Sequence, residues 1–224
     1  MRTPSLAVVL LVGAIGSAAH ADSILAVVSD DALANMRGRY LDAGQITYFG
    51  IQMVSSWRNA DGSVSGNAAV LYGSPQDPKL TAYNYAGKQN EGSAERVPDG
   101  LASAGGVIQV NQVAGSGNQS GNATTITVGR PGQLNPATPG AGWQSVPLGQ
   151  GVSADGGRLR VEVVHGTAGS ALQQIGSGQL LQITRINANG VAATNALNIK
   201  LELDPSRISA SQLVQAQQAL LRGL

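Results

Sequence analysis

Residues 107–128, VIQVNQVAGSGNQSGNATTITV, are the most informative stretch of the chain, because the chain contains a second copy of them. Residues 180–201, LLQITRINANGVAATNALNIKL, align with this stretch without a gap at an offset of 73 positions. Each copy has two runs of β-type residues around a centre rich in Gly, Asn and Ala or Ser. A repeat of this kind indicates one supersecondary unit that the fold uses more than once.

The positions that are identical in the two copies are glycine, amide and apolar residues. They are Gln109 and Gln182, Gly117 and Gly190, Asn122 and Asn195, Ala123 and Ala196, and Ile126 and Ile199. A third, weaker copy lies at residues 62–68, GSVSGNA. All three copies share the form Gly-x-x-x-(Gly or Thr)-Asn-Ala, which is typical of turn-forming and structural positions and carries no catalytic residue type.

Two structures fit these repeats. Asn189-Gly190 lies between two alternating runs, which is a strong local signal for a β-hairpin. Stacked arches are the alternative, because glycine permits sharp corners and stacked Asn and Gln side chains form ladders of amide hydrogen bonds. Apolar and polar side chains alternate in residues 197–203 and 159–163, which favours an antiparallel sheet with one face exposed to solvent.

The remaining strong signals predict an all-β fold. Residues 45–58 are rich in β-branched and aromatic side chains, Asp61-Gly62 predicts a turn, and 68–72 predicts a returning strand. Residues 209–222 have a capping serine and an apolar stripe, which predict a helix. We therefore expect three related hairpin or arch units in an antiparallel sheet, sandwich or short solenoid, with short N- and C-terminal helices.

The predicted organisation follows these composition changes along the chain. It comprises a signal peptide at 1–21, an N-terminal segment with a short helix at 22–44, a β-rich region with two repeat units at 45–128, a Gly/Pro-rich linker or loop at 129–154, a β-rich region with the third repeat unit at 155–205, and a C-terminal helix at 206–224.

The first 21 residues predict export. Arg2 precedes a short apolar core at 6–15, and Ala19-His20-Ala21 fits a small-x-small cleavage site. We expect the mature chain to have no transmembrane span and to reside in the periplasm, on the outer surface or outside the cell. The stretch from Asp30 to Arg39 fits either a structural helix or a processing signal like the leaders read by double-glycine peptidases.

Composition argues against several partners. Removal of residues 1–21 leaves 13 basic and 13 acidic residues, a balance that gives no reason to expect nucleic acid or an anionic membrane as partner. The chain has no cysteine, so neither disulfides nor thiolate metal sites can form. Aromatic residues make up 4% and charged residues 12%, while 30 of 224 residues are glycine, which suits closely stacked strands.

The sequence predicts no catalytic, cofactor-binding or metal site. His165 is the single histidine after residue 21, and no Walker loop, dinucleotide fingerprint or nucleophile elbow occurs. No His, Asp and Glu residues lie at the spacing of a metal site. We therefore expect a protein that is not an enzyme and has no cofactor.

The run from Ala114 to Ala123, AGSGNQSGNA, resembles the repeats of functional-amyloid fibre proteins of pseudomonads (the Fap system), which contain Ala-Gly-x-x-Asn-Gln-x-x-Asn-Ala. Curli repeats are more distantly similar. The cysteine-containing C-terminal motif of the family is absent here, so the resemblance implies a minor, accessory or nucleating component rather than the major fibre subunit.

The resulting hypothesis is an exported, non-enzymatic structural or accessory component of a bacterial surface fibre, biofilm matrix or adhesive layer. Its partners would be other fibre subunits or itself, with an outer-membrane exporter. The residues expected to act in assembly or strand pairing are Gln109, Gln112, Asn118, Asn122 and Asn195. The alternative is a periplasmic or surface β-sandwich that binds a carbohydrate or protein partner through the ligand-facing aromatics Trp57 and Trp143.

Overall fold

The computed structural model describes residues 46–86, 92, 96–132, 139–176, 178–204 and 206. The predicted signal peptide, N-terminal helix and C-terminal helix lie outside these residues. So does the Asp30–Arg39 segment.

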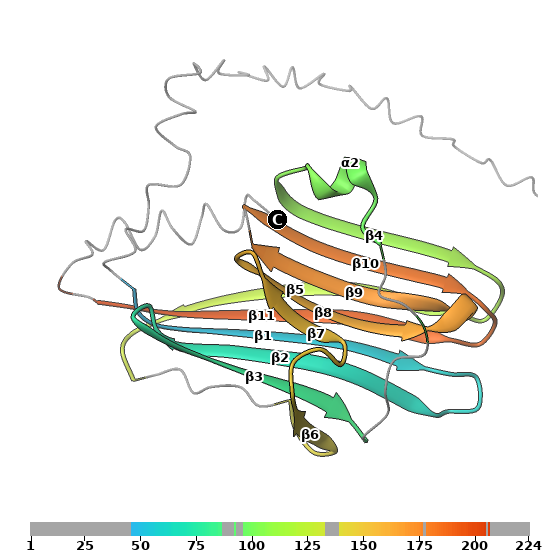
Figure 1. Ribbon diagram of the computed structural model, residues 1–224, viewed down its shortest axis with the longest axis horizontal. Coiled ribbons are helices and arrows are strands. Elements are labelled where there is room, and N and C mark those ends of the chain that lie inside the picture. The colour runs from blue at the N-terminus through green and yellow to red at the C-terminus, as the bar shows by residue number, and fades with distance from the viewer. Residues whose placement is uncertain are drawn as a thin grey trace, which may run out of the picture. The chain divides into compact units, whose positions relative to one another are not determined.

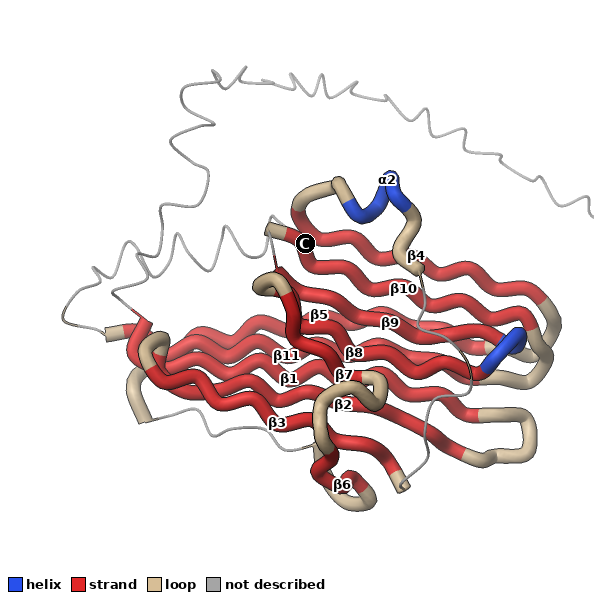
Figure 2. Tube along the Cα trace, in the orientation of Figure 1, coloured by secondary structure: helices blue, strands red, loops and turns tan. Residues whose placement is uncertain are grey.

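The described residues are mostly strands, and the all-β prediction is confirmed (Figure 2). The strands are β1 (Ile46–Arg58), β2 (Val64–Ser74), β3 (Asp77–Tyr85), β4 (Gly106–Ala114), β5 (Gln119–Gly129), β6 (Trp143–Val146), β7 (Val152–Asp155), β8 (Arg158–His165), β9 (Gly169–Gly176), β10 (Gln179–Asn187) and β11 (Ala192–Leu203). A four-residue helix, α2 (Asp99–Ala102), precedes β4, and a 3₁₀ turn (Gly166–Ala168) joins β8 to β9.

The strands form two open sheets that face each other (Figure 1). One is six-stranded, in the order β5-β11-β1-β2-β3-β6, and the other is five-stranded, in the order β4-β10-β9-β8-β7. Both sheets are mixed rather than purely antiparallel, because β4 pairs with β10 and β5 pairs with β11 in parallel.

The two strong repeats form stacked arches. Strands β4 and β5 are consecutive in the chain but lie in different sheets, and the same is true of β10 and β11. Residues 106–129 therefore form a first arch and residues 179–203 a second arch. The hairpin interpretation of Asn189-Gly190 is wrong, since the two strands that this corner joins do not pair with each other.

The arches stack in the register of the sequence repeat. Val107 pairs with Leu180 in one sheet and Asn122 pairs with Asn195 in the other, so every position lies on the position 73 residues later. The gap-free alignment exists because stacked arches of equal length keep identical side chains at the same level.

The third copy keeps this register although it belongs to a hairpin. Strands β1 and β2 pair antiparallel around the turn at 59–63. Ser55 of β1 pairs with Asn195 on one side and with Asn67 on the other, so Asn67 lies level with its repeat counterparts. The repeat glycines Gly62, Gly117 and Gly190 have φ of 83°, 69° and 67°, a region that favours glycine at each turn.

Aliphatic side chains fill the space between the sheets. One cluster of buried residues includes Met53, Val161 and Leu197, and a second surrounds Trp57, which has no exposed surface. Leu181 and Ile183 point to the other side of the five-stranded sheet and are covered by side chains of the segment around α2, including Leu101. The second arch is therefore buried on both faces of β10.

The Gly/Pro-rich segment at 129–154 contains regular structure. Its strands β6 and β7 have four residues each and lie at the edges opposite to β5 and β4 (Figure 1). Because β6 belongs to one sheet and β7 to the other, this segment is a short third arch that ends both sheets.

Replacing Leu197 by Ala should lower the free energy of unfolding by about 3 kcal/mol, because Leu197 is 2% exposed and the change leaves a cavity between the sheets. Urea titration followed by Trp57 fluorescence measures this loss. Leu148→Ala is the matched control: Leu148 is 51% exposed, so a change within about 0.5 kcal/mol is expected. Equal losses in the two variants would contradict the position of the core.

Candidate functional site

The first arch occupies the edge of both sheets at once. Strand β5 ends the six-stranded sheet and β4 ends the five-stranded sheet, so among the described strands each has one neighbour (Figure 1). We call the outward side of Gly106–Ala114 and Gln119–Gly129 the β4–β5 edge. An edge strand presents backbone N–H and C=O groups that can pair with another chain.

A row of glutamines crosses the five-stranded sheet. Gln109 donates from Nε2 to Oε1 of Gln182 at 2.7 Å, and Gln182 donates from Nε2 to Oε1 of Gln173 at 3.1 Å. Gln173 in turn donates to the backbone oxygen of Val54 in the facing sheet at 2.7 Å. The glutamine-to-glutamine hydrogen bonds of this row therefore all run from the β4–β5 edge inward.

A second row, of asparagines and a serine, crosses the six-stranded sheet. Ser55 donates from Oγ to Oδ1 of Asn195 at 2.7 Å, and Asn195 donates from Nδ2 to Oδ1 of Asn122 at 2.9 Å. Asn122 donates from Nδ2 to the backbone oxygen of Val110 at 3.1 Å and to Oδ1 of Asn111 at 3.2 Å. From Ser55 to Asn122 the donors point toward the edge.

The two rows also connect the two sheets, both between the arches and within them. Gln182 donates to the backbone oxygen of Ala123 at 3.1 Å, and Asn195 donates to that of Ile183 at 3.0 Å. Gln182 and Asn195 are 0% and 1% exposed. A buried amide without a partner costs about 1–3 kcal/mol, so these contacts hold the second arch in one register.

The row of buried asparagines continues past β1 into strands β2 and β3. Asn84 donates to Oδ1 of Asn67 at 3.0 Å, and Asn67 donates to the backbone oxygen of Glu162 in the facing sheet at 2.7 Å. Both asparagines are buried. The third repeat copy therefore contributes to the same polar layer as the first two.

The remaining predicted assembly residues join the corners and faces of the arches. Asn118 donates to the backbone oxygen of Ala188 at 2.6 Å and accepts from the backbone N–H of Val191 at 2.9 Å. Gln112 accepts a hydrogen bond from Nε of Arg185 at 2.9 Å on the exposed side.

The structure thus places all of the predicted assembly residues at the contact between the two arches. These are Gln109, Gln112, Asn118, Asn122 and Asn195. Their action on a separate subunit stays a prediction. Gln173 was missed, because it lies outside the repeat and no pattern in the sequence aligns it with Gln182.

The two tryptophans lie away from the β4–β5 edge. Trp57 is fully buried, stacks on His165 with ring centroids 5.1 Å apart and donates from Nε1 to Asn59 at 2.8 Å, so it has no surface for a ligand. Trp143 is partly exposed and packs edge-on against Tyr85 at 5.5 Å.

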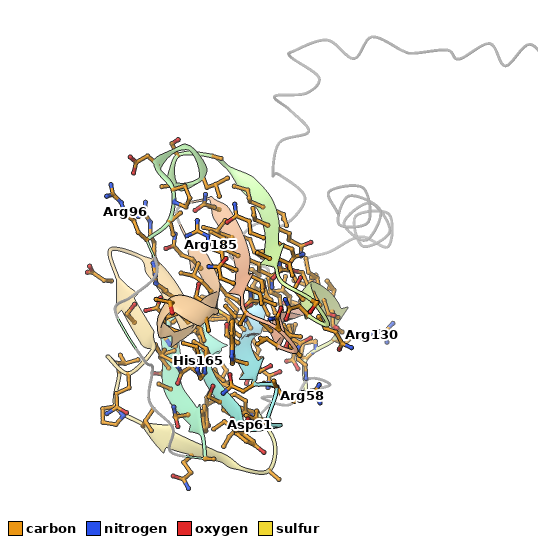
Figure 3. The ribbon with its side chains drawn as sticks, turned by 90° about the vertical axis from the view of Figure 1, so that its right-hand side faces the viewer. Arg58, Asp61, Arg96, Arg130, His165 and Arg185 are labelled. Carbon is orange, nitrogen blue, oxygen red and sulfur yellow. The ribbon has the colours of Figure 1, made fainter. Side chains whose placement is uncertain are left out.

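His165 contributes to packing. Its Nε2 lies 2.6 Å from Oγ of Ser65. Among the residues that the structure describes, no group of three or more His, Cys, Asp or Glu side chains is placed to hold a metal ion. The arginines labelled in Figure 3 come from different parts of the fold: Arg58 ends β1, Arg96 precedes α2, Arg130 follows β5 and Arg185 lies in β10.

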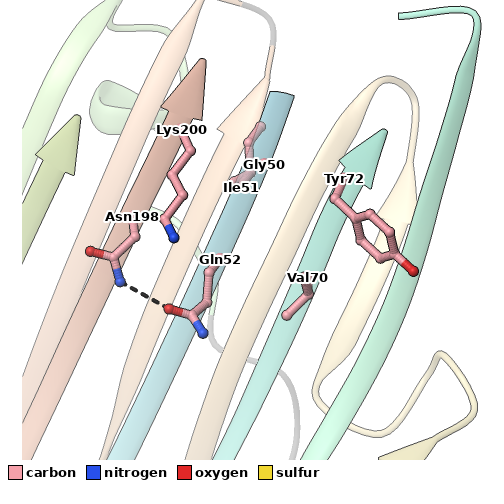
Figure 4. A pocket seen from close by; sticks show the side chains of 7 residues that line it. All are labelled: Gly50, Ile51, Gln52, Val70, Tyr72, Asn198 and Lys200. Atoms are coloured by element: carbon pink, nitrogen blue, oxygen red, sulfur yellow. Dashed lines mark hydrogen bonds between the residues drawn. The ribbon is translucent and has the colours of Figure 1, made fainter. Parts of the chain in front are cut away.

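Two hollows among the described residues differ in size and lining. One on the outer face of the six-stranded sheet, beside the Gln52–Asn198 hydrogen bond of 2.9 Å, holds about 10 Å³, close to the volume that one water needs (Figure 4). A wider one of about 560 Å³ opens between the sheets and includes Ile51, Leu80 and Ile175 in its lining. In the described part of the chain, no helix has the length and apolar character to cross a membrane.

Comparison with known proteins finds relatives that are named as amyloid subunits. A protein of Pseudomonas fluorescens named functional amyloid subunit FapE is 31% identical over 210 residues, covering 83% of this chain and 83% of the relative. The chain belongs to the FapE family. The FapE of Pseudomonas aeruginosa is 30% identical over 214 residues, covering 88% of this chain and 85% of the relative. No family model and no solved structure matches the chain.

Membership of the FapE family confirms the resemblance to Fap-type systems that the Gly/Asn/Gln repeats indicated. The relatives carry the name of amyloid subunits rather than of enzymes. In this FapE-family chain the sequence repeat is a stacking repeat, since each copy lies directly on the other.

Replacing Asn195 by Ala should lower the free energy of unfolding by about 3 kcal/mol, because the acceptors on Asn122 and Ile183 and the hydroxyl of Ser55 lose a buried partner. Asn198→Ala is the matched control on the same strand. Asn198 lies on the outer face and donates one hydrogen bond to Gln52, so a loss of about 0.5 kcal/mol is expected. Urea titration of both variants makes the comparison, and an equal effect would refute the buried amide row.

Proposed function

We propose that this FapE-family chain is an exported, non-enzymatic accessory subunit of a functional-amyloid fibre, and that it joins the fibre through the β4–β5 edge. One observation carries the proposal. The chain stacks one arch on another in parallel register, and the outermost arch is covered on one side only by described residues. In cross-β fibres each layer likewise pairs with the layer above and the layer below.

The side chains of the first arch are suited to a further layer. Val107 and Val113 are 46% and 48% exposed, whereas their counterparts Leu180 and Ile186 are 9% and 0% exposed beneath them. A further arch would cover the two valines in the same way. That burial contributes about 1 kcal/mol for each valine, in addition to the backbone hydrogen bonds of both edge strands.

The opposite end of the sheets is unsuited to the same contact. Its outermost strands, β6 and β7, have four residues each, and Pro147 directly follows β6. Short strands and proline are common means of protecting a sheet edge, because proline lacks a backbone donor. Among the described strands there is therefore one full-length arch surface.

Two copies of the chain cannot extend each other through this surface in the observed register. Bringing two β4–β5 edges face to face requires a two-fold rotation, which places the facing strands antiparallel. The parallel register seen between the arches requires a partner that exposes the opposite side of an arch. This supports a different fibre subunit as partner, rather than a second copy of the chain.

The proposals that the chain is exported and that it is not an enzyme are supported by its sequence and its family. Residues 1–21 have the pattern of a signal peptide, which supports export. An outer-membrane exporter as the route to the surface is part of the same proposal. The relatives' name, functional amyloid subunit, supports a structural role.

Substoichiometric full-length chain should shorten the lag time of fibre formation by a Fap-type fibre subunit, because the β4–β5 edge supplies a preformed layer. Val113→Lys should restore the lag time of the fibre subunit alone, since a charge would lie beneath the next apolar side chain. Thioflavin fluorescence against time measures the effect.

Leu148→Lys is the matched control for this experiment. Leu148 is 51% exposed and lies between β6 and β7, far from the β4–β5 edge in strand order, so this variant should retain the full effect. A wild-type chain that leaves the lag time unchanged, or two lysine variants that behave alike, would overturn the proposed docking surface.

A further inference from the structure

We infer that the β4–β5 edge selects its partner by two amide contacts of opposite polarity, and that the partner is a β-arch with glutamine, glycine and asparagine at fixed spacing. The glycine lies eight residues and the asparagine thirteen residues after the glutamine, and the arch docks parallel and in register. This inference rests on the proposed function and names the chemistry of the partner.

The glutamine row leaves an acceptor at the edge. Gln109 and Gln182 each donate from Nε2 to the glutamine oxygen of the next strand inward. Within the described residues, Oε1 of Gln182 accepts from Gln109, whereas no hydrogen bond ends on Oε1 of Gln109. A glutamine on an added arch, lying over Gln109 as Gln109 lies over Gln182, would donate to this oxygen.

The asparagine row ends at the edge on Nδ2 of Asn122, a donor whose present partners are the backbone oxygen of Val110 and Oδ1 of Asn111. In the second arch, Nδ2 of Asn195 donates outward to Oδ1 of Asn122 and also contacts Oγ1 of Thr184 at 3.2 Å. In the first arch, Nδ2 of Asn122 turns to Oδ1 of Asn111, which takes the place of Thr184 in the repeat. An asparagine on an added arch would accept from Nδ2 of Asn122 by taking a proton that now points to Oδ1 of Asn111, just as Nδ2 of Asn195 is shared between Asn122, Ile183 and Thr184.

The spacing of the three residues is fixed by the arch. Gln109, Gly117 and Asn122 have the same separations as Gln182, Gly190 and Asn195. The two glycines lie at the corners with positive φ, where their Cα atoms approach closely, since a Cβ on Gly117 would lie 3.8 Å from Gly190. A change of one residue between glutamine and asparagine would turn one of them away from the interior.

The third repeat copy has the glycine and the asparagine but lacks the glutamine, and it does not form an arch. Gly62 and Asn67 keep the five-residue spacing of Gly117 and Asn122, but Val54 stands eight residues before Gly62 where an arch has glutamine. This copy belongs to the β1–β2 hairpin instead of an arch. Glycine and asparagine alone therefore do not define an arch in this chain.

The test uses a fluorescein-labelled peptide with the sequence of residues 180–201, which carries all three residues at the required spacing. Fluorescence anisotropy with the full-length chain should show saturable binding. Gln109→Ala should weaken this binding about tenfold, the effect of losing one well-formed amide hydrogen bond in a desolvated contact. Gln144→Ala, an exposed glutamine on β6 at the opposite end, should leave the affinity unchanged.

A second peptide with one extra glycine after Gly190 tests the spacing and should not bind. Equal binding of the two peptides, or equal effects of the two glutamine variants, would overturn the inference. Protection from hydrogen exchange of the outward-pointing amides of β4 and β5, those that do not bond to β10 or β11, would also overturn it, because the edge would then be covered by another part of the chain.

The experiments can refute the proposed role in the fibre and the proposed amide selection separately. If the chain shortens the lag time of the fibre subunit and Val113→Lys abolishes this, but the peptide does not bind, the docking surface stands and the amide selection is refuted. If the peptide binds as described and the lag time does not change, the selection stands and the role in the fibre is refuted.

Discussion

The hydrogen bonding of amide side chains buried between the two sheets is the constraint on which the rest of the structure depends. Gln182 and Asn195 have no contact with water, so each of their polar atoms needs a partner within the protein. They find these partners on the strands beside them and on the backbone of the facing sheet. An interior with few aromatic residues and no disulfide thereby acquires a defined register.

This constraint explains why one alignment of the arches is favoured over its neighbours. A shift by one residue would move Asn122 off Asn195 in one sheet and Gln109 off Gln182 in the other, leaving buried amides without partners in both. Apolar side chains alone discriminate poorly between registers, because valine, leucine and isoleucine replace one another along these strands. The aliphatic side chains thus supply most of the burial, and the amides determine which residues face each other.

Much of this arrangement could be predicted from the sequence, since the 73-residue repeat is visible without any structure and gives the stacking register directly. The choice between hairpin and arch could not, because Asn189-Gly190 permits both and the decision depends on strands distant in sequence. The same holds for Gln173, which joins the amide row through strand β9 and has no repeat counterpart. Trp57 illustrates a further difficulty: an aromatic residue in a strand has the same pattern whether it faces a ligand or the core.

The difference between the two ends of the sheets has a consequence for the number of copies of this chain in each fibre. If the chain joins the fibre through the β4–β5 edge as proposed, a subunit with one full-length arch surface would occupy a fibre terminus and have no place along the shaft. Its copy number would then follow the number of fibres rather than their mass. The ratio of this chain to the shaft subunit would then determine mean fibre length, and a cell that secretes more of it would assemble more and shorter fibres from the same material. Strands of four residues at one edge and eleven at the other would thus provide a means of regulating fibre length.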